Sequence, residues 1–449
     1  MPSNLQEWLS HISRVHPHEI ELGLGRVKLI AEAMSLSKQP TVVTVAGTNG
    51  KGSVVSVMEN LLCHAGVEVG TYTSPHLHFF NERIRLQGLP CDEALICEAF
   101  SEIDLIREEV SLSYFEFATL AALRIFQRKR VSVALLEVGL GGRLDAVNII
   151  DPDVSVITSI GLDHQDWLGD SREEIGLEKA GILRQGGIFV CGDPDPPLSV
   201  VDKARDLFCV SLYQGQEFGL QANEQPGETH WYGIAPDGSE MCAPLPATTA
   251  VLPINVSTAL QALASAGLGV DLDETATLLA SVKPPGRQEL TEDRETGVPV
   301  MLDVAHNPDS IDALVSAVQR LMRPDPALGH SQSAVHLVIA VMADKDVETI
   351  LTSLVSIADI WYISQVEGAR CLPAIELAQK LKNIDPSATM RCFKGVAEAY
   401  QTACEEAVAG IAEAKEKLVV VAGSFHTVSA ARTLAKCQSD AVSVTPQRD

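Results

Sequence analysis

The sequence is poor in positive charge, in aromatic residues and in long apolar runs. Its 449 residues include 34 lysines and arginines against 59 aspartates and glutamates, which gives a formal net charge of −25. A protein that binds nucleic acid needs a basic surface to neutralise phosphates, so this balance argues against a nucleic-acid partner. No uninterrupted apolar run approaches the roughly 18 residues of a membrane-spanning helix. We therefore expect no membrane association either.

Paired cysteines and a targeting segment are also absent. The ten cysteines are scattered, and no C-x-x-C pair occurs. This spacing indicates neither a disulfide framework nor a thiolate zinc site, and it favours a reducing compartment. Residues 1–19 lack an apolar core followed by a small-residue cleavage site, so they do not form a signal peptide. We therefore expect a cytoplasmic protein.

The length and one internal segment predict two domains. A chain of 449 residues is longer than a single ordinary hydrophobic core supports. The strongest boundary signal is Lys283-Pro284-Pro285-Gly286-Arg287, in which two prolines and a glycine interrupt the periodic patterns. We predict a larger domain over residues 1–284 and a smaller domain over residues 285–449.

Apolar runs that alternate with helical patterns predict the fold class. Such runs are typical of parallel strands buried on both faces, and their alternation with helices indicates βαβ units. We predict an α/β protein with an N-terminal doubly wound sheet, a small antiparallel excursion over residues 208–252, and a smaller, Rossmann-like C-terminal domain. The predicted strands are residues 42–46, 67–73, 131–138 and 154–158, then 298–304, 335–341, 359–363 and 418–422.

A glycine-rich loop follows the first predicted strand. Residues 47–53 read Gly-Thr-Asn-Gly-Lys-Gly-Ser and precede a helical pattern over residues 54–64. A glycine-rich turn between a strand and a helix presents N–H groups and the positive end of the helix dipole, which together cradle phosphate. The spacing departs from the P-loop pattern G-x-x-x-x-G-K-[ST], because Gly52 separates Lys51 from Ser53. A P-loop-type nucleotide site and an ordinary tight turn both remain open.

Polar clusters also follow three other strands of the first domain. They cover residues 74–76, 137–145 and 163–166. In doubly wound sheets ligands bind beyond the carboxyl ends of the strands. We therefore expect these clusters and the glycine-rich loop to lie on one edge of the sheet.

Glu137 ends an otherwise apolar strand. A carboxylate there is costly to bury unless it is paired or bound to metal. Its partner is either Arg143 or a Mg²⁺ ion, to which Ser74 would add a hydroxyl oxygen. His164 is an unusual Mg²⁺ ligand, since hard cations prefer oxygen, and a hydrogen-bonding role in its loop is the alternative.

Lys179 lies in a helix predicted over Ser171–Leu183, and Ser171 forms a capping-box pattern with Glu174. Lysines are almost always exposed, so a surface pair with Glu174 or Glu178 is the simplest interpretation. The alternative is a role at the phosphate site.

The second domain repeats the pattern of a strand that runs into a helix start. Asp303 and His306 precede Asn307. Helix capping accounts for Asn307 but not for the other two residues. Asp303 could accept a hydrogen bond from a ribose hydroxyl, and His306 could orient a substrate. Ser424 is either a helix cap or a substrate contact. Arg287 is either part of a solvated hinge or a ligand of nucleotide phosphate.

Nine segments of the chain, in order, resemble the folylpolyglutamate synthase group of the Mur ligase superfamily. The resemblance extends from about residue 20 to residue 428, and it is closest to the bifunctional bacterial members, which are also dihydrofolate synthases. The segments are Val45–Ser53, Thr73–His76, Tyr114–Phe117, Glu137–Asn148, Ser159–Gly169, Glu178–Ile182, Pro285–Gln288, Asp303–Pro308 and Gly423–Val428.

The resemblance implies an ATP-dependent amide ligation. ATP phosphorylates the carboxylate of 7,8-dihydropteroate or the γ-carboxylate of a folate, and the amine of L-glutamate then attacks the acyl phosphate. Phosphorylation is needed because an ionised carboxylate is a poor electrophile, and the two anions must be held together by positive charge and N–H donors. Two Mg²⁺ ions and a monomeric enzyme are also implied.

Site residues are implied by position. Lys51, Lys179 and His306 would be catalytic, and Lys179 matches a lysine that is carbamylated in the family. A carbamate is anionic, so it would attract Mg²⁺ where an ammonium group would repel it. The metal ligands would be Ser74, Glu137 and His164. The nucleotide would contact Thr48, Asn49, Gly50, Lys51, Gly52, Asn255, Arg287 and Asp303. The pterin and glutamate substrates would contact Ile20, Glu21, Leu22, Ser113, Tyr114, Phe115, Glu116, Leu144, Asp145, Ala146, Ser424 and His426.

Three other functions remain to be compared with this prediction. A folylpolyglutamate synthase without the first activity would share the same chemistry. A cell-wall ligase of the Mur type would need a further domain for a UDP-sugar, and only about 40 residues precede the phosphate loop. A non-catalytic nucleotide-binding switch would need no second substrate domain.

Overall fold

The computed structural model divides the chain into two compact units, Met1–Val282 and Lys283–Asp449. In the part of the chain that it describes, every helix is too short or too polar to span a lipid bilayer. The described residues are 2–16, 21–38, 41–222, 229–246, 249–269, 274–322, 332–368, 370–409 and 414–436.

An eight-stranded sheet organises the first unit. Six neighbouring strands are parallel. At one edge β3 pairs antiparallel with β2, and β4 pairs antiparallel with β3. The predicted doubly wound parallel sheet is therefore confirmed. In spatial order the strands are β4 (Leu89–Pro90), β3 (Ile84–Leu86), β2 (Val69–Tyr72), β5 (Val133–Glu137), β1 (Thr41–Ala46), β6 (Val154–Ile157), β7 (Ile188–Cys191) and β8 (Val210–Tyr213).

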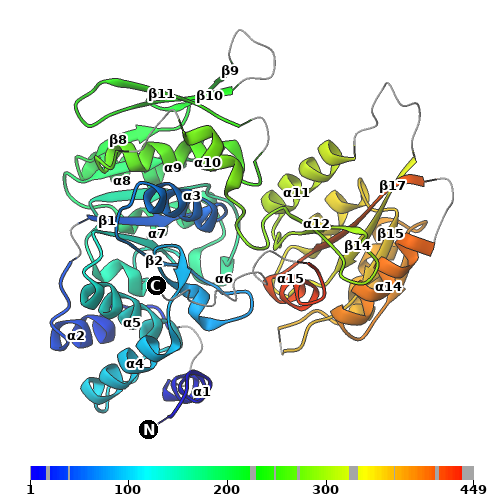
Figure 1. Ribbon diagram of the computed structural model, residues 1–449, viewed down its shortest axis with the longest axis horizontal. Helices are drawn as coiled ribbons and strands as arrows, with labels where there is room; N and C mark the ends of the chain where they lie inside the picture. Colours follow the sequence, from blue (N-terminus) through cyan, green and yellow to red (C-terminus); the bar gives the residue numbers. More distant parts are fainter. Residues whose placement is uncertain are drawn as a thin grey trace, which may run out of the picture. The chain divides into compact units, whose positions relative to one another are not determined.

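Helices cover both faces of this sheet. Successive residues of one strand point to opposite faces, so Val42 of β1 packs into one hydrophobic cluster while Val43 and Val45 pack into the other. Figure 1 shows the two helical layers on either side of the strands. One layer contains α1 (Leu5–Val15), α2 (Gly25–Ala33), α4 (Glu93–Arg107) and α5 (Tyr114–Lys129), and the other contains α3 (Lys51–His64), α9 (Pro253–Ser265) and α10 (Thr275–Ser281).

The region predicted as an antiparallel excursion needs one correction. Its first strand, β8, pairs in parallel with β7 and belongs to the main sheet. The reason is that α8 (Leu198–Asp206) connects the two strands, and a strand–helix–strand crossover produces parallel pairing. Only β9 (Gly219–Ala222), β10 (Thr229–Ile234) and β11 (Glu240–Pro244) form the separate antiparallel sheet.

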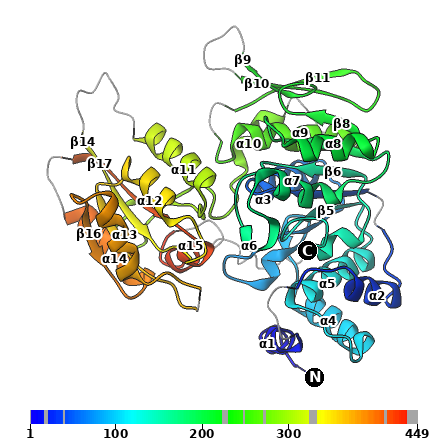
Figure 2. The ribbon, with the colours of Figure 1, turned by 180° about the vertical axis from the view of Figure 1, so that it is seen from behind.

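The helix that carries Lys179 is shorter than predicted. Ser171 caps α7 (Arg172–Lys179) and forms the predicted capping box with Glu174. The helix then tightens into a 3-10 turn, Ala180–Ile182, instead of continuing to Leu183. The physical reason is that the carbonyl of Glu178 accepts a hydrogen bond from the N–H of Arg143, at 2.9 Å, in place of one from the next helical turn. Figure 2 shows α7 beside α8.

The second unit is a six-stranded sheet with helices on its faces. Its strands are parallel except β12, which is antiparallel to β13. The strands in spatial order are β12 (Glu289–Glu292), β13 (Pro299–Leu302), β17 (Ala414–Ala422), β14 (Gln332–Ile339), β15 (Ile360–Ile363) and β16 (Thr389–Cys392). The helices are α11 (Pro308–Leu321), α12 (Val347–Val355), α13 (Ala374–Ile384), α14 (Val396–Ala409) and α15 (Phe425–Arg432). The unit has the α/β character predicted for the C-terminal domain.

Candidate active site

Strand register brings the predicted polar clusters of the first unit to one edge. In β1, Val45 pairs with Glu137 of β5 and Ala46 pairs with Ile157 of β6. On the other side of β5, Tyr72 of β2 pairs with Leu136. The loops that follow β1, β2, β5 and β6 therefore begin at the same level of the sheet.

The glycine-rich loop leads directly into α3. Gly50 is the cap residue of this helix, with a φ of 88°, and the helix begins at Lys51. The Lys51 ammonium group donates to the carbonyls of Gly47, at 3.0 Å, and Thr48, at 3.2 Å. The loop thus ends at the N-terminus of a 14-residue helix, which favours an anion.

Three glycines in this loop lie close to three other residues, two of which, Asn255 and Glu137, are predicted site residues. A Cβ atom on Gly47 would lie 1.7 Å from Thr158 Oγ1, and one on Gly50 would lie 2.5 Å from Asn255 Oδ1. A Cβ atom on Gly52 would lie 3.7 Å from Glu137 Oε1. The backbone at Gly50 and Gly52 therefore passes close to Asn255 and Glu137, which are predicted nucleotide and metal contacts.

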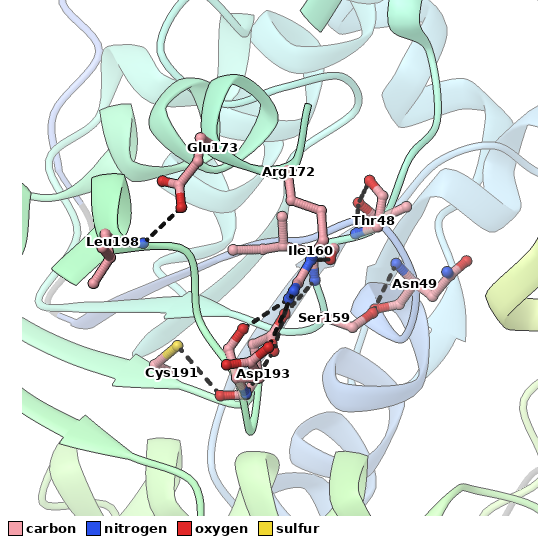
Figure 3. A network of polar contacts seen from close by, with 11 residues as sticks. Thr48, Asn49, Ser159, Ile160, Arg172, Glu173, Cys191, Asp193 and Leu198 are labelled. Carbon is pink, nitrogen blue, oxygen red and sulfur yellow. Dashed lines mark hydrogen bonds and ion pairs between the residues drawn. The ribbon is translucent and has the colours of Figure 1, made fainter. Parts of the chain in front are cut away.

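Residues after β6 hydrogen-bond to the loop, although no role was predicted for Thr158 or Ser159 from the sequence. The N–H of Thr48 donates to the Ser159 carbonyl at 2.6 Å, and the Thr158 hydroxyl donates to the Asn49 carbonyl at 2.6 Å. The N–H of Asn49 donates to Ser159 Oγ at 3.3 Å (Figure 3). Because these bonds fix the loop from outside, its conformation does not depend on its own glycines alone.

Arg172 and Asp193 both hydrogen-bond to the main chain of Ile160, in the segment that follows β6. Figure 3 shows their side chains meeting at Ile160, next to Ser159. The signal that would have revealed Asp193 is the apolar run Ile188–Cys191 followed by Gly192-Asp193, which repeats the strand-to-turn pattern of the other clusters.

Glu137 is 6% exposed at the end of β5. Its Oε2 accepts a hydrogen bond from the N–H of Ser74 at 3.1 Å. Arg143, the alternative partner, instead pairs with Glu178 at 2.8 Å. A carboxylate beside a serine, on the edge that holds the phosphate loop, matches the oxygen donors that Mg²⁺ prefers.

Lys179 is not a surface lysine. It is 3% exposed, and its ammonium nitrogen donates to the Gly47 carbonyl at 3.0 Å. The pKa of Lys179 is lowered to about 7, mainly by burial and also by charge repulsion from Lys51, while Asp163 opposes the shift. Glu174, one of the two suggested surface partners of Lys179, instead forms the capping box with Ser171.

His164 lies on the exposed side of its loop, with a φ of 52°. Its main-chain N–H donates to Asp163 Oδ1 at 2.9 Å. Across the described ranges, no group of three or more His, Cys, Asp or Glu side chains converges as a metal site. A metal at this edge would therefore take its remaining ligands from phosphate and water, as Mg²⁺ does in phosphoryl-transfer sites.

The segments predicted to contact the pterin also come together. The N–H of Gly23 donates to the Leu144 carbonyl at 3.3 Å, which joins the segment containing Glu21 and Leu22 to the loop after β5. Arg26 pairs with Glu21 and, at 3.2 Å, with Glu116. Ile20 lies outside the described residues.

The start of α5 forms another part of this region. Ser113 and Glu116 make a capping box, in which the Ser113 N–H donates to Glu116 Oε2 at 2.7 Å. The ring of Phe115 lies so close to Gly139 that a Cβ atom there would be 2.6 Å from it. The ring of Tyr114 is half-buried beneath the guanidinium of Arg83, 5.4 Å from its centroid.

Asp145 is buried within the loop after β5, just before Ala146. Its carboxylate accepts hydrogen bonds from the N–H groups of Gly139, Leu140 and Val147 at 2.9–3.0 Å. Burial nevertheless raises the pKa of Asp145 to about 6, against the effect of these bonds. The side chain organises the predicted pterin loop.

The second unit gathers its predicted residues around Phe425. The Arg287 guanidinium lies 5.4 Å from the ring centroid, and the His306 ring lies 6.1 Å from it. Asp303 is buried, which raises its pKa, while Arg287 opposes the shift. Its oxygens accept from the N–H groups of Gln288 and Ala305 at 3.0 and 2.8 Å.

Ser424 and His426 differ in exposure. Ser424 is buried, caps α15 and accepts from the N–H of Thr427 at 3.1 Å. His426, two residues later, is exposed. His306 donates from Nδ1 to the Val304 carbonyl at 2.7 Å, which leaves Nε2 as the other hydrogen-bonding atom of the ring.

Family models match both units of the chain. Residues 45–205 match the Mur ligase middle domain, and residues 286–425 match the Mur ligase, glutamate ligase domain. The chain is 39% identical over 428 residues to the dihydrofolate synthase/folylpolyglutamate synthase of Escherichia coli, covering 95% of this chain and 94% of that protein.

Two solved structures are similar over nearly the whole chain. E. coli FolC in complex with DHPP and ADP has a TM-score of 0.85 and 37% identity, covering 96% of this chain and 98% of that one. The bifunctional folylpolyglutamate synthase/dihydrofolate synthase of Yersinia pestis, complexed with AMPPNP and Mn ion, has a TM-score of 0.83 and 37% identity, with the same two coverages.

Proposed function

The chain belongs to the dihydrofolate synthase/folylpolyglutamate synthase family of Mur ligases, and we propose that it joins L-glutamate to 7,8-dihydropteroate and to the γ-carboxylate of folates. The observation that carries this proposal is the shared edge at which the phosphate loop, Glu137 and Lys179 meet. A non-catalytic nucleotide switch offers no reason to bury Lys179 there. A cell-wall ligase is disfavoured by the bifunctional relatives that match nearly the full chain.

The chemistry couples two displacements. A carboxylate oxygen of the first substrate attacks the γ-phosphorus of ATP and ADP leaves, which forms an acyl phosphate. The amine of L-glutamate then attacks the acyl carbon, loses a proton and displaces phosphate, so that an amide bond remains. The substrate carboxylate, the triphosphate of ATP and L-glutamate all carry negative charge and must be held together. Preorganised positive charge and N–H donors supply that stabilisation.

The phosphate loop provides this clamp for ATP. Thr48, Asn49, Gly50 and Gly52 would contact the triphosphate through main-chain N–H groups at the start of α3. Lys51 would turn from the carbonyls that it now contacts toward the phosphate oxygens. Gly47 and Gly50 support this role, because a Cβ atom on either residue would collide with the side chain of Thr158 or Asn255.

Two Mg²⁺ ions complete the proposed site. Ser74 and Glu137 would hold the first and His164 the second. Bound Mg²⁺ would neutralise the phosphate charge and favour attack at phosphorus. The buried Glu137 carboxylate next to Ser74 supports the first site, and the relative from Y. pestis was crystallised with Mn ion.

Lys179 would act as a carbamate. Its neutral amine would attack the carbon of CO₂ and release one proton, which leaves a carbamate anion with two oxygen atoms. Its burial and its lowered pKa support this proposal, because only the neutral amine reacts.

The remaining site residues divide between nucleotide and substrates. Asn255, Arg287 and Asp303 would contact the nucleotide. The pterin would lie among Glu21, Leu22, Ser113, Tyr114, Phe115, Glu116, Leu144, Asp145 and Ala146, with Ile20 assigned from sequence alone. In the second unit His306, Ser424 and His426 would orient L-glutamate, and the ring of His306 is already oriented by its bond to Val304.

We further propose a cytoplasmic monomer. The nine described cysteines are free thiols, as expected in a reducing compartment. The net charge of −25 makes like molecules repel one another.

ADP release tests the proposed reaction. We expect it to require L-glutamate together with dihydropteroate, with 7,8-dihydrofolate as the product, and in a parallel assay to require L-glutamate together with a folate. Activity in the folate assay alone would identify a folylpolyglutamate synthase. No product in either assay at saturating substrates would contradict the proposed function.

A further inference from the structure

A charged pair outside the predicted site lies behind the phosphate loop. Asp193 follows β7 and is 4% exposed, whereas Arg172 is the first residue of α7. The guanidinium and the carboxylate lie 3.2 Å apart. Both side chains converge on the main chain of Ile160 (Figure 3).

The pair fixes Ile160 through both of its main-chain groups. The Ile160 N–H donates to Asp193 Oδ2 at 2.7 Å, and the Ile160 carbonyl accepts from Arg172 Nε at 2.8 Å. These two bonds set the orientation of the peptide groups on either side of Ile160. They therefore set the positions of Ser159 and Gly161.

Ser159 and Gly161 are the residues that hold Thr48 of the phosphate loop. The Thr48 N–H donates to the Ser159 carbonyl at 2.6 Å. The Thr48 hydroxyl donates to the Gly161 carbonyl at 3.1 Å and accepts from the Gly161 N–H at 3.0 Å. A displacement of Ile160 is thus transmitted to the loop by hydrogen bonds on both sides.

A second connection runs through α7. Arg172 also donates to the Asp195 carbonyl at 2.7 Å, which ties the first turn of the helix to the loop after β7. At the other end of the helix, Lys179 donates to the Gly47 carbonyl at 3.0 Å. Arg172 therefore influences the first residue of the phosphate loop as well as Thr48.

We propose that Arg172 and Asp193 are positioning residues that hold the phosphate-binding loop in the conformation that binds ATP. The inference rests on the proposed use of this loop for ATP. Hydrogen bonds in which one partner is charged are stronger than neutral ones, and Asp193 makes them with Arg172 and with two N–H groups, those of Ile160 and Asp195. Catalysis is sensitive to such support, because small displacements of a phosphate-binding group have large effects on rate.

Two substitutions separate positioning from simple stabilisation. Arg172→Lys keeps the positive charge but has a single nitrogen atom. That nitrogen cannot donate to the Ile160 carbonyl, the Asp193 carboxylate and the Asp195 carbonyl at the same time. Asp193→Asn keeps the shape but removes the charge. The matched control is Arg124→Lys, which weakens the ion pair between α5 and Glu102 of α4, outside the phosphate-loop network.

The readouts are the affinity for AMPPNP by calorimetry, the KM values for ATP and L-glutamate, and the melting temperature. We expect the AMPPNP Kd and the KM for ATP to rise about tenfold in both Arg172→Lys and Asp193→Asn. The KM for L-glutamate should stay unchanged. The control should lower the melting temperature without changing either constant for nucleotide.

Three results would overturn the proposal. Equal AMPPNP affinity in the wild type and both variants would leave the pair as a stabilising contact only. A tenfold weaker affinity in Arg124→Lys as well would show a general response to lost stability. Failure of the wild-type protein to bind AMPPNP would instead refute the proposed function, and this inference with it. If one variant does not fold, the other decides among these outcomes.

Discussion

At the scale of single residues, burial decides the chemistry of Lys179. The sequence favoured an exposed lysine paired with a neighbouring glutamate, since most lysines are exposed. In the structure the side chain is 3% exposed and contacts the phosphate loop. The same burial that lowers its pKa removes water from around the amine, so the residue is suited to a reaction that needs a neutral nitrogen.

Replacing Lys179 by alanine tests its place in the site. We expect the ligation rate to fall by a factor of about 100 or more, because a charged group that positions metal or phosphate is lost. The free energy of unfolding should change little, since the cost of burying an amine disappears together with its bond to Gly47. The measurements are ADP release and urea denaturation, with the exposed Lys129→Ala as control. Full activity in Lys179→Ala would remove the residue from the site.

The pKa of Lys179 predicts a pH-dependent reaction with CO₂. An amine with a pKa of about 7 is roughly nine-tenths neutral at pH 8 and roughly one-tenth neutral at pH 6. In ¹³CO₂-saturated buffer we expect a carbamate carbon signal by NMR at pH 8 and a much weaker one at pH 6. Lys179→Met should lack the signal at both pH values. A signal of equal strength at the two pH values, or one that persists in the variant, would contradict the proposal.

At the scale of elements, the phosphate loop depends on structures that lie far from it in the sequence. The segment after β6 hydrogen-bonds to the loop, while Asn255 of α9 lies beside Gly50 and Glu137 lies beside Gly52. Gly47 is the tightest of these positions, with a φ of 151° and Thr158 directly beside it. The loop is therefore built by three elements and not by its own sequence alone.

Gly47→Ala tests this dependence. The new Cβ atom would meet Thr158 Oγ1, so we expect a loss of about 2–5 kcal/mol in the free energy of unfolding and a loss of AMPPNP binding. Gly66→Ala is the matched control, because Gly66 also has a positive φ, 72°, but a Cβ atom added there would have no other atom within 4 Å. It should cost only about 1–2 kcal/mol of backbone strain and leave binding intact. Equal stability and binding in the two variants would contradict this account. Urea denaturation and calorimetry supply both measurements.

The two corrections among the elements have local causes. The predicted antiparallel region begins with the parallel strand β8, because α8 precedes it. Helix α7 ends at Lys179, because the N–H of Arg143 takes the Glu178 carbonyl. Neither cause is visible in the periodicity of the segment itself, since each depends on a neighbouring element.

At the scale of the whole molecule, charge favours separate molecules. A net charge of −25 opposes self-association at low ionic strength. We expect sedimentation equilibrium to give the monomer mass, 48.1 kDa, at all protein concentrations tested. The mass should stay the same at about 0.5 M salt, where charge repulsion is screened within a few ångströms. A mass that doubles with concentration would show a dimer.

The sequence by itself determined the family, the fold class and the edge of the sheet at which the predicted site residues would gather. Family membership and fold were confirmed. These features are readable because strand and helix periods, glycine turns and polar strand ends are local properties of the chain. For the same reason the sequence alone indicates Ser74, Glu137 and the loop from Gly47 to Gly52 as site residues.

Only the tertiary structure decided which side chains are buried and what they touch. Lys179 meets Gly47 across 132 residues of sequence, and Asp193 meets Ile160 across 33. Burial and hydrogen bonding set the pKa and the orientation of such groups, and both arise when distant segments pack together. The pairing of Arg172 with Asp193 therefore could not be read from the sequence, although the pair supports the loop that the sequence indicates most clearly.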